Sequence, residues 1–89
     1  MRRTRWTIHA LRAMEDRHSE ISDVEKTLKA PDMVAIDSPL RAVFMRRYLA
    51  SDLDRVMLLR VVVEETSTER VTIAAYRTSQ IDRYLRGRL

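Results

Sequence analysis

The residues best suited to chemistry lie near the C-terminal end of the chain, where an apolar run gives way to Tyr76, Arg77, Thr78 and Ser79. Side chains at the end of a strand are held by a rigid scaffold and still reach solvent. A phenol, a guanidinium and two hydroxyls in such a place suit a phosphate or a nucleotide better than they suit a core. Arg83 follows shortly afterwards and adds another cation.

His9 lies near the other end of the chain and is the side chain best suited to accept a proton near neutral pH. It stands at the start of a predicted helix, where the positive end of the helix dipole favours the neutral imidazole. A histidine that only packs or caps the helix is the alternative. His18 falls in a predicted loop and is interpreted as a solvated loop residue.

Several kinds of catalytic centre are disfavoured by the composition. Two histidines and no cysteine cannot form a structural zinc site, and the carboxylates show no ligand spacing. Gly87 is the only glycine, so neither a nucleophile elbow around a serine nor a phosphate-cradling loop is expected. Chemistry without metal or cofactor remains, carried by His, Arg, Tyr, Thr and Ser. Such a set is compatible with RNA cleavage, in which the 2′-hydroxyl is the nucleophile and the protein supplies a base, a cation and an acid.

Size and charge are typical of one small basic domain. The chain has 89 residues, which predicts a single domain over residues 1–89, and its net charge is +4 with a pI near 10.1. This charge favours an anionic partner such as nucleic acid, although many small domains are simply basic. The N-terminus lacks the apolar stretch of a secretory signal, and the longest apolar run, Val56 to Val63, is too short to cross a membrane. We therefore expect a cytoplasmic protein that does not bind membranes.

The periodicity of apolar residues predicts an α+β domain with two N-terminal helices packed on a four-stranded antiparallel meander and a short C-terminal helical tail. A capping-box pattern at Ser22–Glu25 begins the second helix, and Pro31 ends it. The predicted helices are 9–17 and 22–30. The predicted strands are 33–37, 42–49, 55–64 and 69–75, with an extended lead-in at 4–8 and a helical turn at 79–85.

Alternation along these strands assigns side chains to the two faces of the sheet. The face that packs on the helices is expected to include Val43, Met45, Leu49, Met57, Leu59, Val61, Val63, Val71, Ile73 and Ala75. The other face, expected to be open to solvent, carries Phe44, Arg46, Tyr48, Arg60, Thr72, Ala74 and Tyr76. Aromatic rings mixed with arginine favour a platform for bases and phosphates, with ordinary cross-strand pairs as the alternative. Arg60 stands out because it interrupts an apolar strand and needs a partner.

The order of short motifs resembles the small toxin-like domains of the barnase–EndoU–colicin–RelE superfamily. Within that group it is most similar to a bacterial and phage family, and the layout is also similar to BrnT-type toxins. The motifs are His9-Ala10, Met14 with Arg17, Ile21-Ser22 with Val24, Ala30-Pro31-Asp32, and Ala74-Ala75-Tyr76. Two positions depart from the family pattern. Ala74 stands where a threonine is usual, and His18-Ser19-Glu20 replaces a tighter link between the helices.

This resemblance implies a RelE/barnase-like fold and a metal-independent ribonuclease that acts as the toxin of a toxin–antitoxin pair. Its partners would be RNA, free or on the ribosome, and a cognate antitoxin protein; no cofactor is expected. Together with the residue types, it predicts His9, Tyr76 and Arg60 as catalytic residues. The predicted substrate-binding residues are Arg17, Arg46, Arg77, Thr78, Ser79 and Arg83.

Two other readings stay open at this level. The domain could be a non-catalytic module that binds nucleic acid or protein through its basic face. It could also be an interaction protein whose exposed face or edge strand pairs with another chain, including a second copy of itself in a homodimer.

Overall fold

The structure is a computed structural model that describes residues 3–7 and 21–85. The predicted first helix, together with His9 and Arg17, lies outside the described residues. Within the described part of the chain, neither helix has the length and apolar character needed to cross a membrane.

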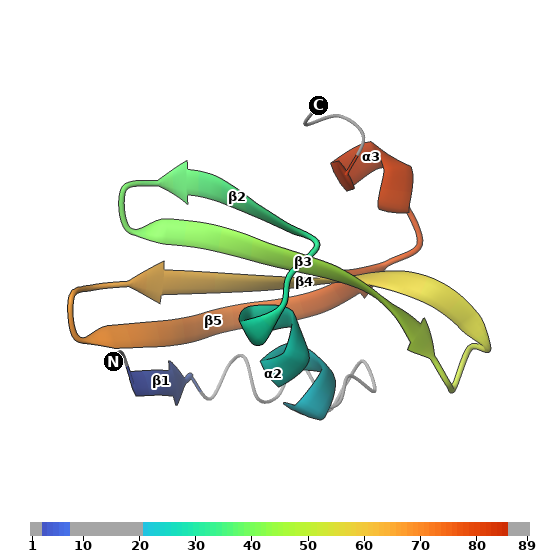
Figure 1. The fold of residues 1–89 in the computed structure, drawn as a ribbon, viewed down its shortest axis with the longest axis horizontal. Coiled ribbons are helices and arrows are strands. Elements are labelled where there is room, and N and C mark those ends of the chain that lie inside the picture. Colours follow the sequence, from blue (N-terminus) through green and yellow to red (C-terminus); the bar gives the residue numbers. More distant parts are fainter. Residues whose placement is uncertain (1–2, 8–20, 86–89) are drawn as a thin grey trace.

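A five-stranded sheet forms the body of the fold (Figure 1). Four strands run antiparallel in a meander, as predicted: β2 (Met33–Ser38), β3 (Arg41–Ala50), β4 (Arg55–Glu65) and β5 (Glu69–Thr78). The segment predicted as an extended lead-in is a fifth strand, β1 (Arg3–Trp6), which pairs parallel to β5. The strand order is therefore β1-β5-β4-β3-β2, with β4 at the centre.

The predicted second helix is present as α2 (Ile21–Lys29) and packs against one face of the sheet. Val24 and Leu28, one turn apart, are buried against β3 and β4. Thr27 is also buried, and its hydroxyl donates to the carbonyl of Asp23 at 2.8 Å, so the helix carries no unpaired hydroxyl into the core. Pro31 follows the helix and cannot supply the N–H that a further turn would need.

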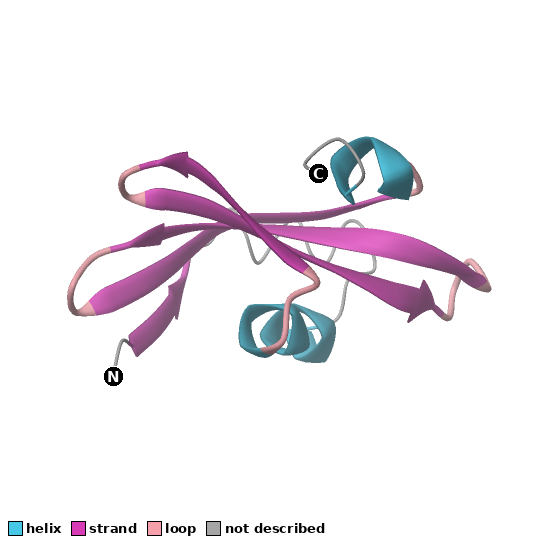
Figure 2. Cartoon of the chain, turned by 45° about the horizontal axis from the view of Figure 1, so that its top comes forward, coloured by secondary structure: helices cyan, strands magenta, loops and turns pink. Residues whose placement is uncertain are grey.

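The second face of the sheet is partly covered by the C-terminal helix α3 (Ile81–Leu85), as Figure 2 shows. Ile81, Tyr84 and Leu85 pack there over a small core that includes Met45 and Leu58. The expectation of a face open to solvent was therefore wrong for the part under α3, whereas Leu49 and Val56, on the same face, are exposed. The predicted helical turn at 79–85 folds back over the sheet, because its apolar residues recur at helical spacing and bury against the sheet.

The predicted face of β3 was also wrong. Phe44 lies opposite Val61 in the β3–β4 ladder, so the even residues of β3 share the α2 face with the odd residues of β4. Phe44 and Tyr48 accordingly pack with α2, whereas Val43 and Met45 pack under α3. Both parities of β3 are apolar and buried, so alternation within this strand could not choose between them.

A β-bulge in β5 changes the face of its first half. Val62 pairs with Ala74 and Val63 pairs with Thr72, which leaves Ile73 as an extra residue between them. Thr72 is consequently fully buried on the α2 face, opposite to the prediction. Beyond the bulge, Ala74 and Tyr76 lie on the face of α3, together with Arg60 as predicted.

Candidate active site

Arg60 is held between two tyrosine rings on the α3 face of the sheet. Its neighbours Leu59 and Val61 are fully buried on the α2 face, so alternation sends the Arg60 side chain to the other side. The guanidinium carbon lies 5.2 Å from the centre of the Tyr76 ring and 4.0 Å from that of Tyr84. Arg60 Nη1 also donates a hydrogen bond to the Tyr76 hydroxyl. We call these three residues the tyrosine cage.

The cage is built by strand register and by the docking of α3. Arg60 and Tyr76 are directly opposed residues of β4 and β5, so their side chains share one face at short distance. Tyr84 comes from α3, which is anchored by Ile81 and Leu85 on either side of it in sequence. Tyr84 was not among the predicted site residues. The apolar spacing of residues 81, 84 and 85 is the signal that could have placed its ring against the sheet.

The cage differs from every comparable arginine environment in the described residues. Four described arginines are partly buried, and three of them pair with a carboxylate: Arg46 with Asp23 at 3.4 Å, Arg70 with Glu65 at 3.5 Å, and Arg77 with Asp52 at 2.7 Å. Arg60 forms no ion pair within residues 3–7 and 21–85, and its Nε is buried without a hydrogen-bond partner there. Tyrosine rings attract a cation but do not neutralise it. The cage therefore keeps a positive charge that suits an anion.

Arg46 and Arg77, predicted to bind substrate, lie on the α2 face instead of beside Arg60. Arg77 donates two hydrogen bonds to Asp52, at 2.8 and 2.7 Å, and so ties the β3–β4 turn to β5. These bonds raise the pKa of Arg77 above its usual value; burial opposes the shift, and the adjacent Tyr48 hydroxyl adds to it. The structure thus separates these two arginines from the cage, and a role for them in substrate binding stays a prediction.

Thr78, Ser79 and Arg83 lie where β5 passes into α3, close to the cage. The Thr78 hydroxyl accepts a hydrogen bond from the Gln80 N–H at 3.1 Å, which turns the chain out of the strand. Arg83 donates to the Gln80 side-chain oxygen at 3.0 Å, and its guanidinium lies 5.6 Å from the Tyr84 ring. The C-terminal cluster seen in the sequence is therefore split, with Tyr76, Thr78 and Arg83 near Arg60 and Arg77 on the other face.

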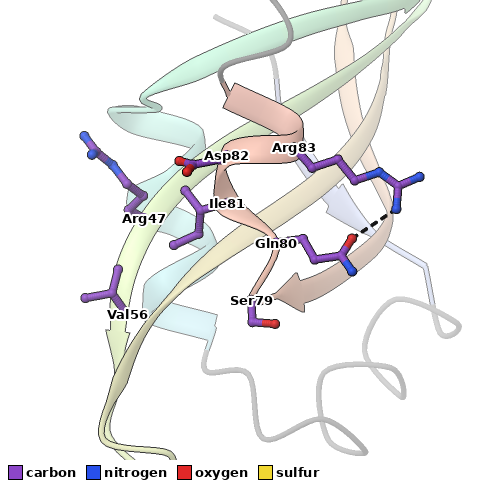
Figure 3. Close-up of a pocket in the computed structure, with 7 residues that line it drawn as sticks. All are labelled: Arg47, Val56, Ser79, Gln80, Ile81, Asp82 and Arg83. Atoms are coloured by element: carbon purple, nitrogen blue, oxygen red, sulfur yellow. Dashed lines mark hydrogen bonds between the residues drawn. The ribbon is translucent and has the colours of Figure 1, made fainter.

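An open depression of about 500 Å³ adjoins this turn, between α3 and the β3–β4 hairpin (Figure 3). It is lined by Arg47, Val56, Ser79, Gln80, Ile81, Asp82 and Arg83. In Figure 3 the Ile81 and Asp82 side chains lie on the side of Arg47 and Val56, while Gln80 and Arg83 extend to the other side of α3.

His9 and Arg17, predicted as catalytic and substrate-binding residues, lie outside the described residues. Thr7 is the last described residue before His9, and its N–H donates to the Thr72 carbonyl on β5 at 3.1 Å. In the described ranges, no three His, Cys, Asp or Glu side chains gather as metal ligands would. Chemistry without a metal stays a prediction.

The chain also matches a family of known proteins. A family model described as "phage-Barnase-EndoU-ColicinE5/D-RelE like nuclease2" matches residues 3–89 of the chain. Neither a curated protein nor a solved structure matches the chain.

Proposed function

Because the chain belongs to this family of phage barnase–EndoU–colicin E5/D–RelE-like nucleases, we propose that it is a metal-independent ribonuclease whose phosphate-binding group is Arg60. The observation that carries the proposal is the tyrosine cage. A partly buried guanidinium with no carboxylate partner among residues 3–7 and 21–85 is costly for a small domain, and such a charge is typical of a site that binds an anionic ligand.

The proposed reaction uses the 2′-hydroxyl of the RNA as nucleophile. A base removes its proton, the 2′-oxygen bonds to phosphorus, and the bond from phosphorus to the 5′-oxygen breaks. An acid protonates that leaving oxygen, so the products are a 2′,3′-cyclic phosphate and a 5′-hydroxyl. Arg60 would stabilise the charge that builds on the non-bridging oxygens, since guanidinium N–H groups match phosphate oxygens two at a time.

Tyr76 is the proposed acid. Its hydroxyl accepts a hydrogen bond from Arg60, so a phosphate bound to Arg60 would lie within reach of the phenolic proton. His9 is the proposed base. In support, Thr7 bonds to Thr72 on the strand that carries Tyr76, and β1 and β5 run in the same direction. β1 therefore runs along β5 toward the end of that strand that carries Tyr76. Thr7, two residues before His9, is the last described residue in this direction.

We also propose that the protein acts as a toxin that cleaves cytoplasmic RNA and is neutralised by a cognate antitoxin. The family is one of nuclease-like proteins, which supports this role without specifying the partner. An antitoxin-like reading frame next to the gene would be the simplest supporting observation.

A non-catalytic RNA-binding module is the second candidate, and one observation favours it. Ala74 lies on the face of Arg60 and Tyr76, where the family pattern has a threonine, so one hydroxyl of the pattern is missing from this face. In this reading the tyrosine cage binds phosphate without turnover.

Cleavage of RNA by purified protein in the presence of EDTA separates the two. The wild type is expected to produce 2′,3′-cyclic phosphate ends, and His9→Ala and Tyr76→Phe are expected to lose most of this activity. Tyr48→Phe is the matched control, because it makes the same substitution at a buried tyrosine on the α2 face, opposite the tyrosine cage. Salt-dependent binding without any cleavage would refute the enzyme and support the module.

A further inference from the structure

We propose that the depression between α3 and the β3–β4 hairpin is a binding site for one base of single-stranded RNA, next to the phosphate held by the tyrosine cage. The inference rests on the proposed function in one respect: it takes RNA as the ligand. It adds a second contact region and a base in place of a phosphate, and it adds Arg47 and Val56 to the predicted Ser79 and Arg83.

The first support is the chemistry of the walls. Val56 and Ile81 present apolar groups, and Val56 is 51 % exposed. Leu49, directly opposite Val56 in the β3–β4 ladder, is 64 % exposed. Together these two neighbouring side chains form an apolar patch that is open to solvent on the α3 face. A nucleobase offers a flat apolar face to such a surface.

The second support is the position of two arginines on either side of this apolar patch. Arg47 is 59 % exposed and uses its Nε to pair with Asp32 at 3.4 Å, so its terminal amino groups have no described partner. Arg83 lies on the other side of α3 (Figure 3). A nucleotide within a strand has a phosphate on each side of its base. One base on the patch would thus bring one phosphate toward Arg47 and the other toward Arg83.

The third support is continuity with the tyrosine cage. Arg83 contacts the ring of Tyr84, and Tyr84 covers Arg60. Ser79 and Gln80, which line the depression, directly follow the strand end that carries Tyr76. A strand of RNA could therefore pass from Arg60 over Arg83 into the depression without leaving this face. The depression is wide and open, as entry of an unstacked base from solvent requires.

The experiment measures binding of RNA that cannot be cleaved. The probe is a fluorescent 2′-O-methyl RNA tetranucleotide, in which the nucleophile is blocked, and a series with one abasic position at a time. Anisotropy titrations compare the wild type with Val56→Asn and with Leu53→Asn. Leu53 is the matched control, since it lies in the turn of the same hairpin, is 46 % exposed and does not line the depression.

We expect Val56→Asn to weaken binding about five- to tenfold, from the apolar area that the base would bury, and Leu53→Asn to leave it unchanged. An abasic nucleotide at one position of the probe should weaken binding to the wild type by a similar factor. It should weaken binding to Val56→Asn no further, because the abasic change and the substitution remove the same contact. If Val56→Asn binds like the wild type, or if the abasic penalty is the same in both proteins, the proposal is wrong. Loss in Val56→Asn of binding to a partner protein, with RNA binding kept, would identify the depression as a protein interface and equally overturn it.

Failure of the base site and failure of the proposed ribonuclease function can be told apart. Cleavage of unmodified RNA is measured in parallel with the same variants. A wild type that cleaves RNA while showing no dependence on Val56 contradicts the base site alone. A wild type that binds through Val56 and never cleaves contradicts the ribonuclease and keeps the base site.

Discussion

Replacing Arg60 with methionine is expected to remove most of the RNA cleavage while leaving the fold almost as stable as before. Methionine keeps an unbranched side chain that can fill the space between the rings of Tyr76 and Tyr84. The change therefore removes the charge and the hydrogen bonding of this position and disturbs the packing little.

The stability side can be worked from the contacts of Arg60. The variant loses one hydrogen bond to Tyr76, worth about 1 kcal/mol, and cation–π contacts with two rings, worth about 0.5–1 kcal/mol each. Against this loss, the variant no longer buries an Nε that has no hydrogen-bond partner among the described residues, a burial that costs the wild type about 1–3 kcal/mol. It also no longer buries a charge that has no carboxylate partner within residues 3–7 and 21–85. These contributions nearly cancel. We expect the free energy of unfolding to change by less than about 1 kcal/mol, which limits the shift in Tm to about 4–8 °C.

The effect on activity is expected to be far larger. Loss of one charged donor aimed at the transition state commonly lowers kcat by about 10²–10³-fold, or about 3–4 kcal/mol. The assay is the initial rate on a fluorogenic RNA, measured beside thermal unfolding of the same preparation by circular dichroism.

Arg77→Met is the control, because the same substitution is made on the opposite face of the sheet. It breaks two charge-assisted hydrogen bonds to Asp52, and the Arg77 side chain is only 12 % exposed. We expect a loss of about 1–3 kcal/mol in stability with cleavage retained below the melting temperature. The reasoning is refuted if Arg60→Met destabilises the fold by more than about 3 kcal/mol, or if it still cleaves at the wild-type rate.

Three further outcomes follow from single contacts. Tyr84→Leu should lower cleavage about tenfold while Tyr84→Phe retains it, because the ring face and not the hydroxyl holds Arg60; equal rates for the two variants would exclude positioning by the ring. Asp32→Asn should cost about 1 kcal/mol at pH 7 and progressively less as the pH falls below about 4. The Arg47 N–H lowers the pKa of this carboxyl, so its contribution to stability is present above the pKa of the unfolded chain and is lost as the pH falls through the lowered pKa. A pH-independent difference in urea midpoints would contradict this. Thr72→Val should raise the Tm by a few degrees, because the Thr72 hydroxyl is fully buried with no hydrogen-bond partner in the described structure; a lower Tm would show that this hydroxyl has a partner.

Local sequence patterns predicted the elements of the described chain well. Pro31 ended the helix as expected, and the polar stretches at 51–54 and 65–68 placed the turns of the meander. Such signals act over three or four residues, so they can be read without knowledge of the fold. The strand β1 was read only as an extended lead-in, because its four residues become a strand only through pairing with β5, more than 60 residues away.

The candidate site was predicted in part. Arg60 and Tyr76 were identified by their types and correctly placed on one face, since the β4–β5 register past the bulge pairs them directly. Arg46 was assigned to the same face and lies on the other, because both parities of β3 are apolar and only the β3–β4 register decides between them. The bulge at Ile73 likewise places Thr72 on the α2 face, and the residue types of this strand do not indicate a bulge.

The sequence alone determined which groups are available: an arginine inside an apolar strand, tyrosines near the C-terminal end, and an excess of positive charge. Periodicity also determined that these groups belong to a meander with helices. The tertiary structure decided which of them meet. Register, the bulge and the docking of α3 enclosed Arg60 between Tyr76 and Tyr84 and gave Arg46 and Arg77 carboxylate partners on the opposite face. Contacts across a sheet depend on which residues are aligned between strands, and that alignment is a property of the whole packed fold.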